Sequence, residues 1–296
     1  MALILTFKHP LIDLIFPSEY DFEQINDLTY KLVSKANKGP ITSINYRAFR
    51  ECTSLESIVI PDSVTNIGNY AFCYSKSLES IVIPNSVKTI GDSAFKGCTS
   101  LKSIIIPNSV NTIEREAFSG CTSLKSVVIP NSVKTIDSFA FYDCKSLESV
   151  VIPDSVNTIG FRAFAYCTSL KSVVISDSVD TIEREAFSCC ESLESIVIPN
   201  SVTNIRDGTF IRCTSLKSIV IPDSVITIGK SAFGGCTTLE SVVIPNSVIS
   251  IQRDVFKNCL SLNTVIINGK TTEYLEKYFE TNYPKIDLEY DDYLLK

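Results

Sequence analysis

The sequence has little of what enzymes use for acid–base and nucleophilic chemistry. Its 296 residues include no tryptophan, one methionine and one histidine, His9. Neither a Ser-His-Asp nor a Cys-His arrangement can be built except around His9, which lies beside Pro10 in an apolar run where a structural histidine is expected. Gly234 and Gly235 belong to a repeat turn and not to a phosphate-binding loop. We therefore predict a protein that is not an enzyme and binds no cofactor.

Basic segments and long apolar runs are also absent. The net charge of -6 divides into -1 for residues 1–40, -2 for 41–269 and -3 for 270–296, so we expect no nucleic-acid partner. No stretch of 18 apolar residues occurs, so no membrane insertion is expected. The N-terminal run has no basic leader or small-residue cleavage site, and no Asn-x-Ser/Thr sequon is present. These features favour a cytoplasmic location, with the cell surface or non-standard secretion as the alternative.

The eleven cysteines do not suggest a disulfide framework, because their number is odd and nine of them recur at a fixed spacing. Cys73 and the Cys189-Cys190 pair have no partner CxxC or histidine pair, so we predict no metal site. A column of small, buried, reduced thiols is the expected role.

What the sequence does contain is a 23-residue repeat that recurs without insertion or deletion. It reads Cys-x-Ser-Leu-(Glu/Lys)-Ser-(Ile/Val)-Val-Ile-Pro-(Asp/Asn)-Ser-Val-x-x-Ile-x-x-x-Ala-Phe-x-x and fills the chain from about Ile41 to Gly269. A fixed period of this length predicts a solenoid of about ten coils, one elongated body and not two globular domains. The cysteine position is occupied by Cys52, Ser75, Cys98, Cys121, Cys144, Cys167, Cys190, Cys213, Cys236 and Cys259.

One coil is expected to contain a short strand and a turn. Leu55, Ile58 and Ile60 alternate with polar or outward residues, which is the period of a strand with one buried face, and Pro61 ends it. A turn follows, and Ala71-Phe72 begins a short turn or 3₁₀ piece. Stacked coils then form a parallel sheet and an aromatic spine from Phe49, Phe72, Phe95, Phe118, Phe141, Phe164, Phe187, Phe210, Phe233 and Phe256.

The unit closely resembles the BspA-like (Treponema pallidum type) leucine-rich repeats, in register about ten times over roughly three quarters of the chain. The resemblance implies a right-handed leucine-rich-repeat arc with the parallel sheet on the concave side and the short turns or 3₁₀ pieces on the convex side. It also implies a role in binding proteins, often at a bacterial or protist surface in contact with host or neighbouring cells. It supplies no catalytic residues, because the motif residues are structural.

The two ends are predicted to cap the solenoid. In residues 1–40, Leu3–Phe7 reads as a strand and Phe22, Ile25, Leu28 and Leu32 recur at helical spacing, which predicts a strand followed by a helix. In residues 270–296, Thr271–Thr281 reads as a helix and an acidic tail follows Pro284. Capping is the default role, and recognition by the N-terminal segment is the alternative.

Two sets of residues are candidates for binding a protein partner. The first is an outward column of β-branched residues on the concave sheet, represented by Val128, Val151 and Val174. The second is the variable part of the repeat, which contains aromatic residues and arginines, the usual anchors of interfaces: Tyr70, Tyr74, Tyr142, Phe161, Tyr166 and Arg212. Both sets also have structural readings, since valine suits a strand and aromatic residues can cover coil edges. The function expected is an interaction scaffold; the alternative is a self-associating or structural module that uses the concave stripe or an end.

Overall fold

The structure is a computed structural model that describes residues 3–7, 20–26, 29–34, 40–268 and 273–291. His9 lies outside these residues. The chain divides into two compact units, 1–147 and 148–296. The division falls inside a repeat, between Leu147 and Glu148, and the 23-residue period continues through it. The division into two caps and a central solenoid at residues 40 and 270 stays a prediction.

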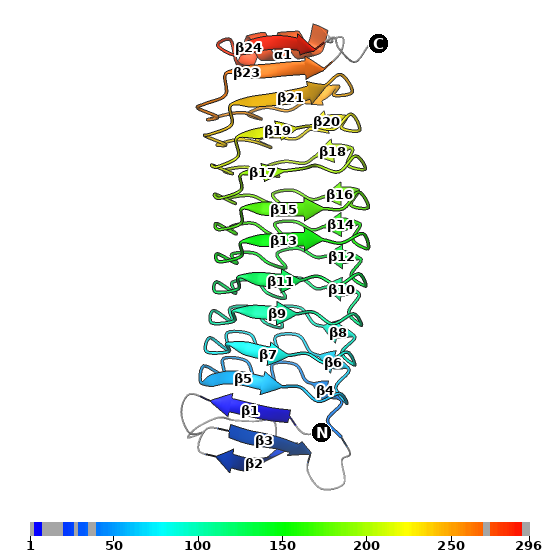
Figure 1. The fold of residues 1–296 in the computed structure, drawn as a ribbon, viewed down its shortest axis with the longest axis vertical. Coiled ribbons are helices and arrows are strands. Elements are labelled where there is room, and N and C mark those ends of the chain that lie inside the picture. The colour runs from blue at the N-terminus through cyan, green and yellow to red at the C-terminus, as the bar shows by residue number, and fades with distance from the viewer. Residues whose placement is uncertain (1–2, 8–19, 27–28, 35–39, 269–272, 292–296) are drawn as a thin grey trace. The chain divides into compact units, whose positions relative to one another are not determined.

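Unit 1 is a parallel solenoid in which each coil contributes two short strands (Figure 1). The longer strand of each coil begins near the serine of the repeat, and the shorter one is the Thr/Asn-Ile or Ser-Ile pair that precedes the turns. The coil strands are β4 (Ser43–Ile44), β5 (Leu55–Val59), β6 (Asn66–Ile67), β7 (Ser80–Val82), β8 (Thr89–Ile90), β9 (Ser103–Ile105), β10 (Thr112–Ile113), β11 (Ser126–Val128) and β12 (Thr135–Ile136).

Unit 2 repeats the same plan and has a helix before its last described strand (Figure 1). Its elements are β13 (Ser149–Ile152), β14 (Thr158–Ile159), β15 (Ser172–Ile175), β16 (Thr181–Ile182), β17 (Ser195–Ile196), β18 (Asn204–Ile205), β19 (Ser218–Val220), β20 (Thr227–Ile228), β21 (Ser241–Pro245), β22 (Ser250–Ile251), β23 (Thr264–Asn268), α1 (Glu273–Asn282) and β24 (Asp287–Asp291).

Strand pairing places equivalent residues of successive coils side by side. Between β13 and β15, Val150 pairs with Val173 and Val151 with Val174, and the same one-repeat register holds in the other parallel pairs of either unit. The middle residue of the strand is buried and the next is exposed, as the alternation predicted. The predicted repeat solenoid is confirmed, because each column of the sequence is a ladder in the structure.

The core consists of these ladders. The phenylalanine rings stack nearly parallel, with centroids 5.1–5.4 Å apart from Phe49 to Phe141 in unit 1. The predicted column of buried thiols is confirmed: all eleven cysteines are free and only Cys259 is not fully buried. Repeat thiols donate hydrogen bonds to phenylalanine carbonyls, such as Cys121 Sγ to Phe95 O at 3.2 Å. Ser75, which replaces cysteine in one coil, makes the equivalent bond to Phe49 O at 2.6 Å.

The segment around each Ala-Phe pair is a run of turns, and no 3₁₀ helix occurs in the described part of the chain. Two residues per coil have positive φ, sixteen of them non-glycine and four glycine. This left-handed backbone turns successive N–H groups in different directions. The Cys73 N–H bonds locally to the Tyr70 carbonyl at 3.1 Å, whereas the Tyr74 N–H bonds to the Lys96 carbonyl of the next coil at 2.6 Å. Of the two expected forms, short turns or 3₁₀ pieces, the structure therefore has the turns, because a helix would direct every N–H back along its own coil.

The helix expected within residues 1–40 is wrong. The described part of this segment forms the strands β1 (Leu3–Phe7), β2 (Tyr20–Asn26) and β3 (Thr29–Ser34), of which only β1 was expected. β1 pairs antiparallel with both β3 and β5, so it covers the open edge of the first long coil strand. An unpaired strand edge exposes backbone N–H and C=O groups that another strand can pair with. This pairing decides the structure here, because the short apolar pattern fits a helix and a strand equally well.

At the other end, α1 confirms the expected helix, but the acidic tail begins as a strand. β24 pairs parallel with β23 in the register of the repeat, Thr264 with Asp287. The helix continues the period as well: Phe279 lies one repeat period after Phe256 and extends the ring stack, with centroids 6.2 Å apart. α1 and β24 therefore make a modified eleventh coil, in which a helix replaces the turns.

No helix of the described residues is both long and apolar enough to cross a membrane.

Candidate protein-binding surface

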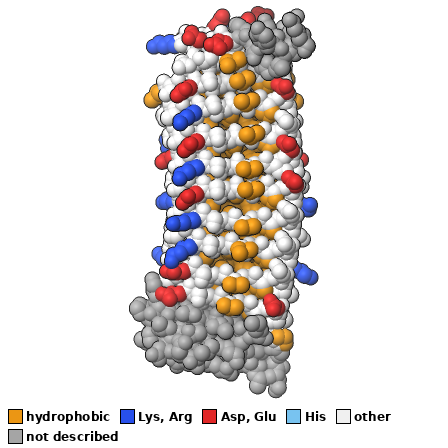
Figure 2. Space-filling view, in the orientation of Figure 1, with side chains coloured by type: hydrophobic (Ala, Val, Ile, Leu, Met, Phe, Trp, Pro, Cys, Tyr) orange, Lys and Arg blue, Asp and Glu red, His pale blue; other side chains and the backbone are white. Residues whose placement is uncertain are grey.

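Each unit exposes one row of β-branched side chains on its sheet, which we call the valine face. In unit 1 it consists of Val59, Val82, Ile105 and Val128, with 40–71% of each residue exposed. In unit 2 it consists of Val151, Val174, Val197 and Val220, with 60–77% exposed. The candidates Val128, Val151 and Val174 thus lie where the sequence placed them, and the row is visible as a line of hydrophobic side chains in Figure 2.

Polar columns flank the valine face on both sides. On one side lie the strand serines and then a column of lysines and glutamates, seen as the mixed blue and red line of Figure 2. In this column Lys102 pairs with Glu79 at 2.7 Å, and both side chains are largely exposed. An exposed pair of this kind contributes only a few tenths of a kcal/mol. On the other side lies the Asp/Asn column of the repeat, which in unit 2 contains Asp154, Asp177, Asn200, Asp223 and Asn246.

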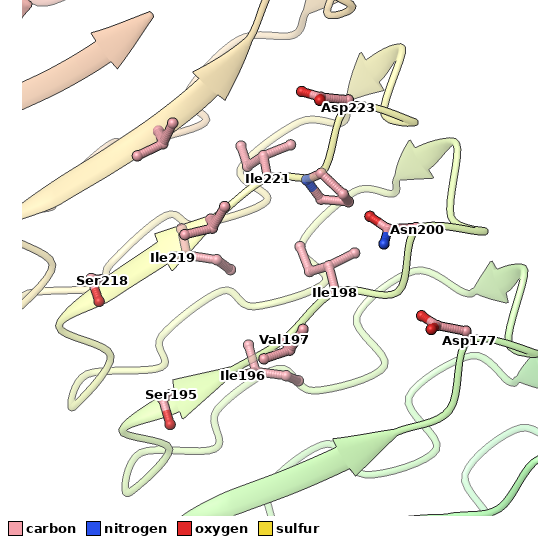
Figure 3. A pocket seen from close by; sticks show the side chains of 13 residues that line it. Asp177, Ser195, Ile196, Val197, Ile198, Asn200, Ser218, Ile219, Ile221 and Asp223 are labelled. Atoms are coloured by element: carbon pink, nitrogen blue, oxygen red, sulfur yellow. The ribbon is translucent and has the colours of Figure 1, made fainter. Parts of the chain in front are cut away.

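A groove of about 430 Å³ opens on the valine face of unit 2, between β17 and β19 (Figure 3). Ile196, Ile198, Ile219 and Ile221 are buried beneath it. The serines at the start of the two strands bound one end, and the Asp/Asn column bounds the other. Val197, which lines it, is the most exposed member of the valine face, at 77%.

The groove lies where the ladder of long strands stops, because β17 does not pair with β19. The ladder of short strands stops one coil earlier, between β16 and β18, whereas β18 and β20 of the two groove coils are paired. In the column of lysines and glutamates, the Glu194 N–H donates a hydrogen bond to the Lys171 carbonyl of the preceding coil at 3.2 Å. Among the described residues, no equivalent bond joins the Lys217 N–H to the Glu194 carbonyl. Across the preceding step, where β16 and β18 do not pair, the rings of Phe187 and Phe210 are 5.9 Å apart, against 5.5 Å for both neighbouring pairs. The two strands that line the groove are therefore not paired with each other.

No single residue of the buried columns marks this place. Thr209 stands where the neighbouring coils have Ala186 and Ala232, but Val255 departs from the same alanine column and the strand ladders continue past it. Unit 1 has an interruption of both ladders at one coil step, where β7 does not pair with β9 and β8 does not pair with β10, although the backbone bond from Lys102 to Glu79 persists at 3.3 Å.

The variable positions form a second surface, the turn face, built from residues of the Ala-Phe turns. Tyr70, Tyr74, Tyr166 and Arg212 all have positive φ, between 59° and 63°. This backbone is uncommon for residues other than glycine, so these side chains occupy positions where the fold favours glycine. Sequence reasoning missed this constraint because only four of the twenty positions carry glycine.

Within unit 1, aromatic residues of the turn face make specific local contacts. Tyr70 meets Tyr46 edge to face at 5.8 Å, and the Arg47 guanidinium lies over both rings. The ring of Tyr74 crosses Gly97 so closely that a Cβ there would lie 2.4 Å from its Cδ1 atom. Tyr142 meets Phe139 edge to face at 5.5 Å.

In unit 2 the turn-face candidates are likewise engaged with their own neighbours. The Arg162 guanidinium lies 5.1 Å from the centre of the Phe161 ring and pairs with Glu185 at 2.6 Å. Tyr166 hydrogen-bonds the side chain of Cys189, while burial raises the pKa of the Cys189 thiol. Arg212 is exposed beside Gly235. In both units these candidates cover coil edges, and each still leaves part of its surface open.

No cluster of three or more histidine, cysteine, aspartate or glutamate side chains suited to a metal ion occurs in the described residues. The groove itself was not predicted from the sequence. Thr209 does not mark it, since Val255 also departs from the alanine column of unit 2 without interrupting the strand ladders.

Comparison with known proteins agrees with this architecture. The profile of the BspA type leucine rich repeat region matches residues 19–146, 89–217, 134–262 and 203–291. A search of curated proteins found no match. Leucine-rich repeat folds generally bind proteins, and a solenoid of this kind is a typical non-enzymatic scaffold.

Solved structures of bacterial repeat proteins are similar over most of the chain. The T. pallidum leucine-rich repeat protein is 27% identical, with 80% of this chain and 92% of that one covered and a TM-score of 0.50. A leucine-rich repeat protein from Eubacterium ventriosum is 26% identical, with 79% and 65% covered and a TM-score of 0.52. The pneumococcal vaccine antigen PcpA, 21% identical with 86% and 72% covered and a TM-score of 0.55, shares the fold. With its repeats matched by the family profile from residue 19 to residue 291, the chain belongs to the BspA-type leucine-rich repeat proteins.

Proposed function

We propose that this protein is a non-enzymatic interaction scaffold that binds an extended protein partner along the valine face. The observation that carries the proposal is the row of four exposed β-branched residues in each unit, with exposed fractions of 40–77%. Large continuous apolar patches on a protein surface usually mark interaction sites.

The fold does not require an apolar residue at this position. The side chain points away from the core, and threonine would satisfy the strand preference equally well. Covering four valines that are about two-thirds exposed would contribute roughly 3 to 4 kcal/mol in each unit before the costs of association. That is enough to bind a partner through many weak contacts, but a uniform row of valines discriminates little between partner sequences.

Specificity is then expected from the varied side chains of the turn face. Tyrosine and arginine are the residues most often found as binding anchors. Tyr70, Tyr74, Tyr142, Phe161, Tyr166 and Arg212 supply these types at different coils. Their local contacts also hold them in place, which lowers the entropy lost when a partner binds.

The test replaces Val128, Val151 and Val174 together with threonine, which keeps the branched shape and adds hydroxyls. We expect loss of partner capture from an extract of the protein's own cells and from candidate extracellular proteins. The matched control replaces Ile226 and Ile249, which are exposed at 42% and 66% outside the valine face, with threonine. Unchanged capture and unchanged self-association in the folded valine variant would refute the proposal.

The alternative function, self-association without a dedicated ligand, predicts a different result. Sedimentation would show a mass that rises with concentration in the wild type and not in the valine variant, with no captured partner. Adhesion to host or neighbouring cells is the form of binding that the family resemblance implies, and it stays a prediction that binding to intact cells would test.

A further inference from the structure

We infer that the groove between β17 and β19 is an anchor site for a positively charged, extended peptide segment of the partner. One large apolar side chain of the peptide would lie between Val197 and Val220, with lysine or arginine beside Asp177 and Asp223. The inference rests on the proposed function and names the chemistry of the partner at one place on the valine face.

The shape of the groove fits a single anchor. Its walls are apolar, from the buried isoleucines of both coils and from the exposed valines, while its two ends are polar (Figure 3). A volume of about 430 Å³ holds a phenylalanine or leucine side chain together with the neighbouring backbone of a peptide. An apolar side chain that fills such a recess has the features of a binding hot spot, since the surrounding residues exclude water.

The charge around the groove selects a cationic partner. Asp177 and Asp223 line it, and no lysine or arginine occurs in the Asp/Asn column of unit 2. Among the described residues, neither carboxylate has a basic group within ion-pair distance. Lysine or arginine on the partner would therefore find carboxylates that are not already paired, and attraction of opposite charges would favour both encounter and register.

The spacing of the two carboxylates sets the spacing of the cations. Asp177 and Asp223 lie two coils apart, roughly 10 Å at the usual separation of strands. In an extended peptide alternate side chains face the same way, and residues four apart are about 13 Å from each other. Cationic residues two positions before and two positions after the apolar anchor therefore face the protein on the same side as the anchor. The flexible lysine side chain makes up the difference between the peptide spacing and the spacing of the two carboxylates.

The binding experiment uses a seven-residue synthetic peptide with blocked ends, phenylalanine at its centre and lysine two positions before and after it. The remaining positions are serine. One analogue has glutamate in place of both lysines, and another has alanine in place of phenylalanine. We expect the lysine peptide to bind the full-length protein, as measured by fluorescence anisotropy of a labelled peptide. Alanine at the centre should weaken it about tenfold and the glutamate analogue should not bind.

Variants of the protein separate the groove from the rest of the valine face. Asp177→Asn with Asp223→Asn should weaken the lysine peptide about fivefold at low salt and remove most of its salt dependence. Val197→Thr with Val220→Thr should weaken it about threefold or more. The controls are Asp62→Asn and Ile105→Thr, which change the same two columns in unit 1. Circular dichroism and melting temperature establish that each variant is folded.

The result that overturns the inference is a lysine peptide that fails to bind, or that binds the folded groove variants as tightly as the wild type. Equal binding of the glutamate analogue would also overturn it. If partner capture still depends on Val128, Val151 and Val174 in that case, the proposed function stands and only the groove assignment fails. If the peptide binds as expected but no partner capture depends on the valine face, the groove assignment stands and the proposed function fails.

Discussion

Tyr74 and Gly97 offer a direct test of how the turn face is held. Both residues have positive φ, and the tyrosine ring lies across the glycine, so a Cβ at residue 97 would come within 2.4 Å of the ring. Gly120 has almost the same backbone, φ +72° against +71°, but its nearest neighbours are 3.6 Å away. Gly97→Ala and Gly120→Ala therefore share the backbone cost and differ in the ring contact.

The magnitudes follow from these distances. Alanine in a left-handed conformation costs about 1–2 kcal/mol, offset by about 0.5–1 kcal/mol because alanine loses less freedom than glycine on folding. We expect Gly120→Ala to lower the free energy of unfolding by about 1 kcal/mol. Gly97→Ala should lose about 1 kcal/mol more, because Tyr74 must leave its place and expose apolar surface.

Urea unfolding of the two variants, alone and in a Tyr74→Ala background, gives the coupling directly. Repeat proteins can lose two-state behaviour, so the transitions are to be compared by two probes before free energies are assigned. With Tyr74 removed, Gly97→Ala and Gly120→Ala should cost the same. If they already cost the same with Tyr74 present, the ring contact does not hold the turn face and the reasoning is wrong.

Two further predictions concern the core and its end. Burial raises the pKa of the Cys52 and Cys121 thiols from 9.0 to about 12, so their contribution to the free energy of unfolding is complete below pH 9 and is lost between pH 9 and 12 as the unfolded thiols ionise. At pH 10 each thiol should lower the free energy of unfolding by about 1.4 kcal/mol. In urea titrations, Cys121→Ser should therefore reduce the fall of stability with rising alkaline pH while changing stability little at pH 7. An unchanged slope would contradict this. Phe279→Ala should destabilise the end of unit 2 by about 3–5 kcal/mol, because the ring is buried at the end of the phenylalanine stack. Tyr274→Phe should cost about 1 kcal/mol, because the Tyr274 hydroxyl hydrogen-bonds both the N–H and the carbonyl of Ile251. Hydrogen exchange of the Ile251 amide should become faster in both variants, and exchange at the wild-type rate would refute the assignment of α1 and β24 as an eleventh coil.

The solenoid could be predicted because a column in this sequence is a ladder in space. Ser, Ile and Val at fixed positions pair with themselves once in every repeat, so the pattern specifies register, buried face and exposed face together. The exposure of Val128, Val151 and Val174 followed from the same alternation. Nothing beyond the period was needed for these conclusions.

The ends were harder because their neighbours are not set by local sequence. Phe22 to Leu32 fits both helical spacing and a strand hairpin. The pairing of β3 with β1, which itself pairs with the edge of β5, decides between them. The C-terminal coil was within reach of the sequence, since Phe279 and Tyr274 stand one repeat period after Phe256 and Ile251. Because the residues around Phe279 have a helical pattern, they do not match the repeat consensus, and the continuation of the period was not recognised.

The left-handed positions could not be read from residue types. Their requirement comes from hydrogen bonds that alternate between a coil and the next one, and the chain fills most of them with tyrosine, arginine, serine or acidic residues instead of glycine. A side chain at such a position is kept at a cost in backbone energy of about 1 kcal/mol or more. The structure thus separates these residues from ordinary surface positions, where no such cost exists.

A ladder of identical coils presents the same chemistry at every step, so it can provide area but cannot tell one segment of a partner from another. Information must come from the steps at which the repeat is broken. In unit 2 the ladder of long strands stops between β17 and β19, beside carboxylates that lack a cation. If Val197→Thr with Val220→Thr weakens the lysine peptide while Ile105→Thr does not, then a gap in strand pairing sets where along a uniform surface a partner is anchored. The same search, for steps at which strand pairing stops, applies to any solenoid whose coils repeat this closely.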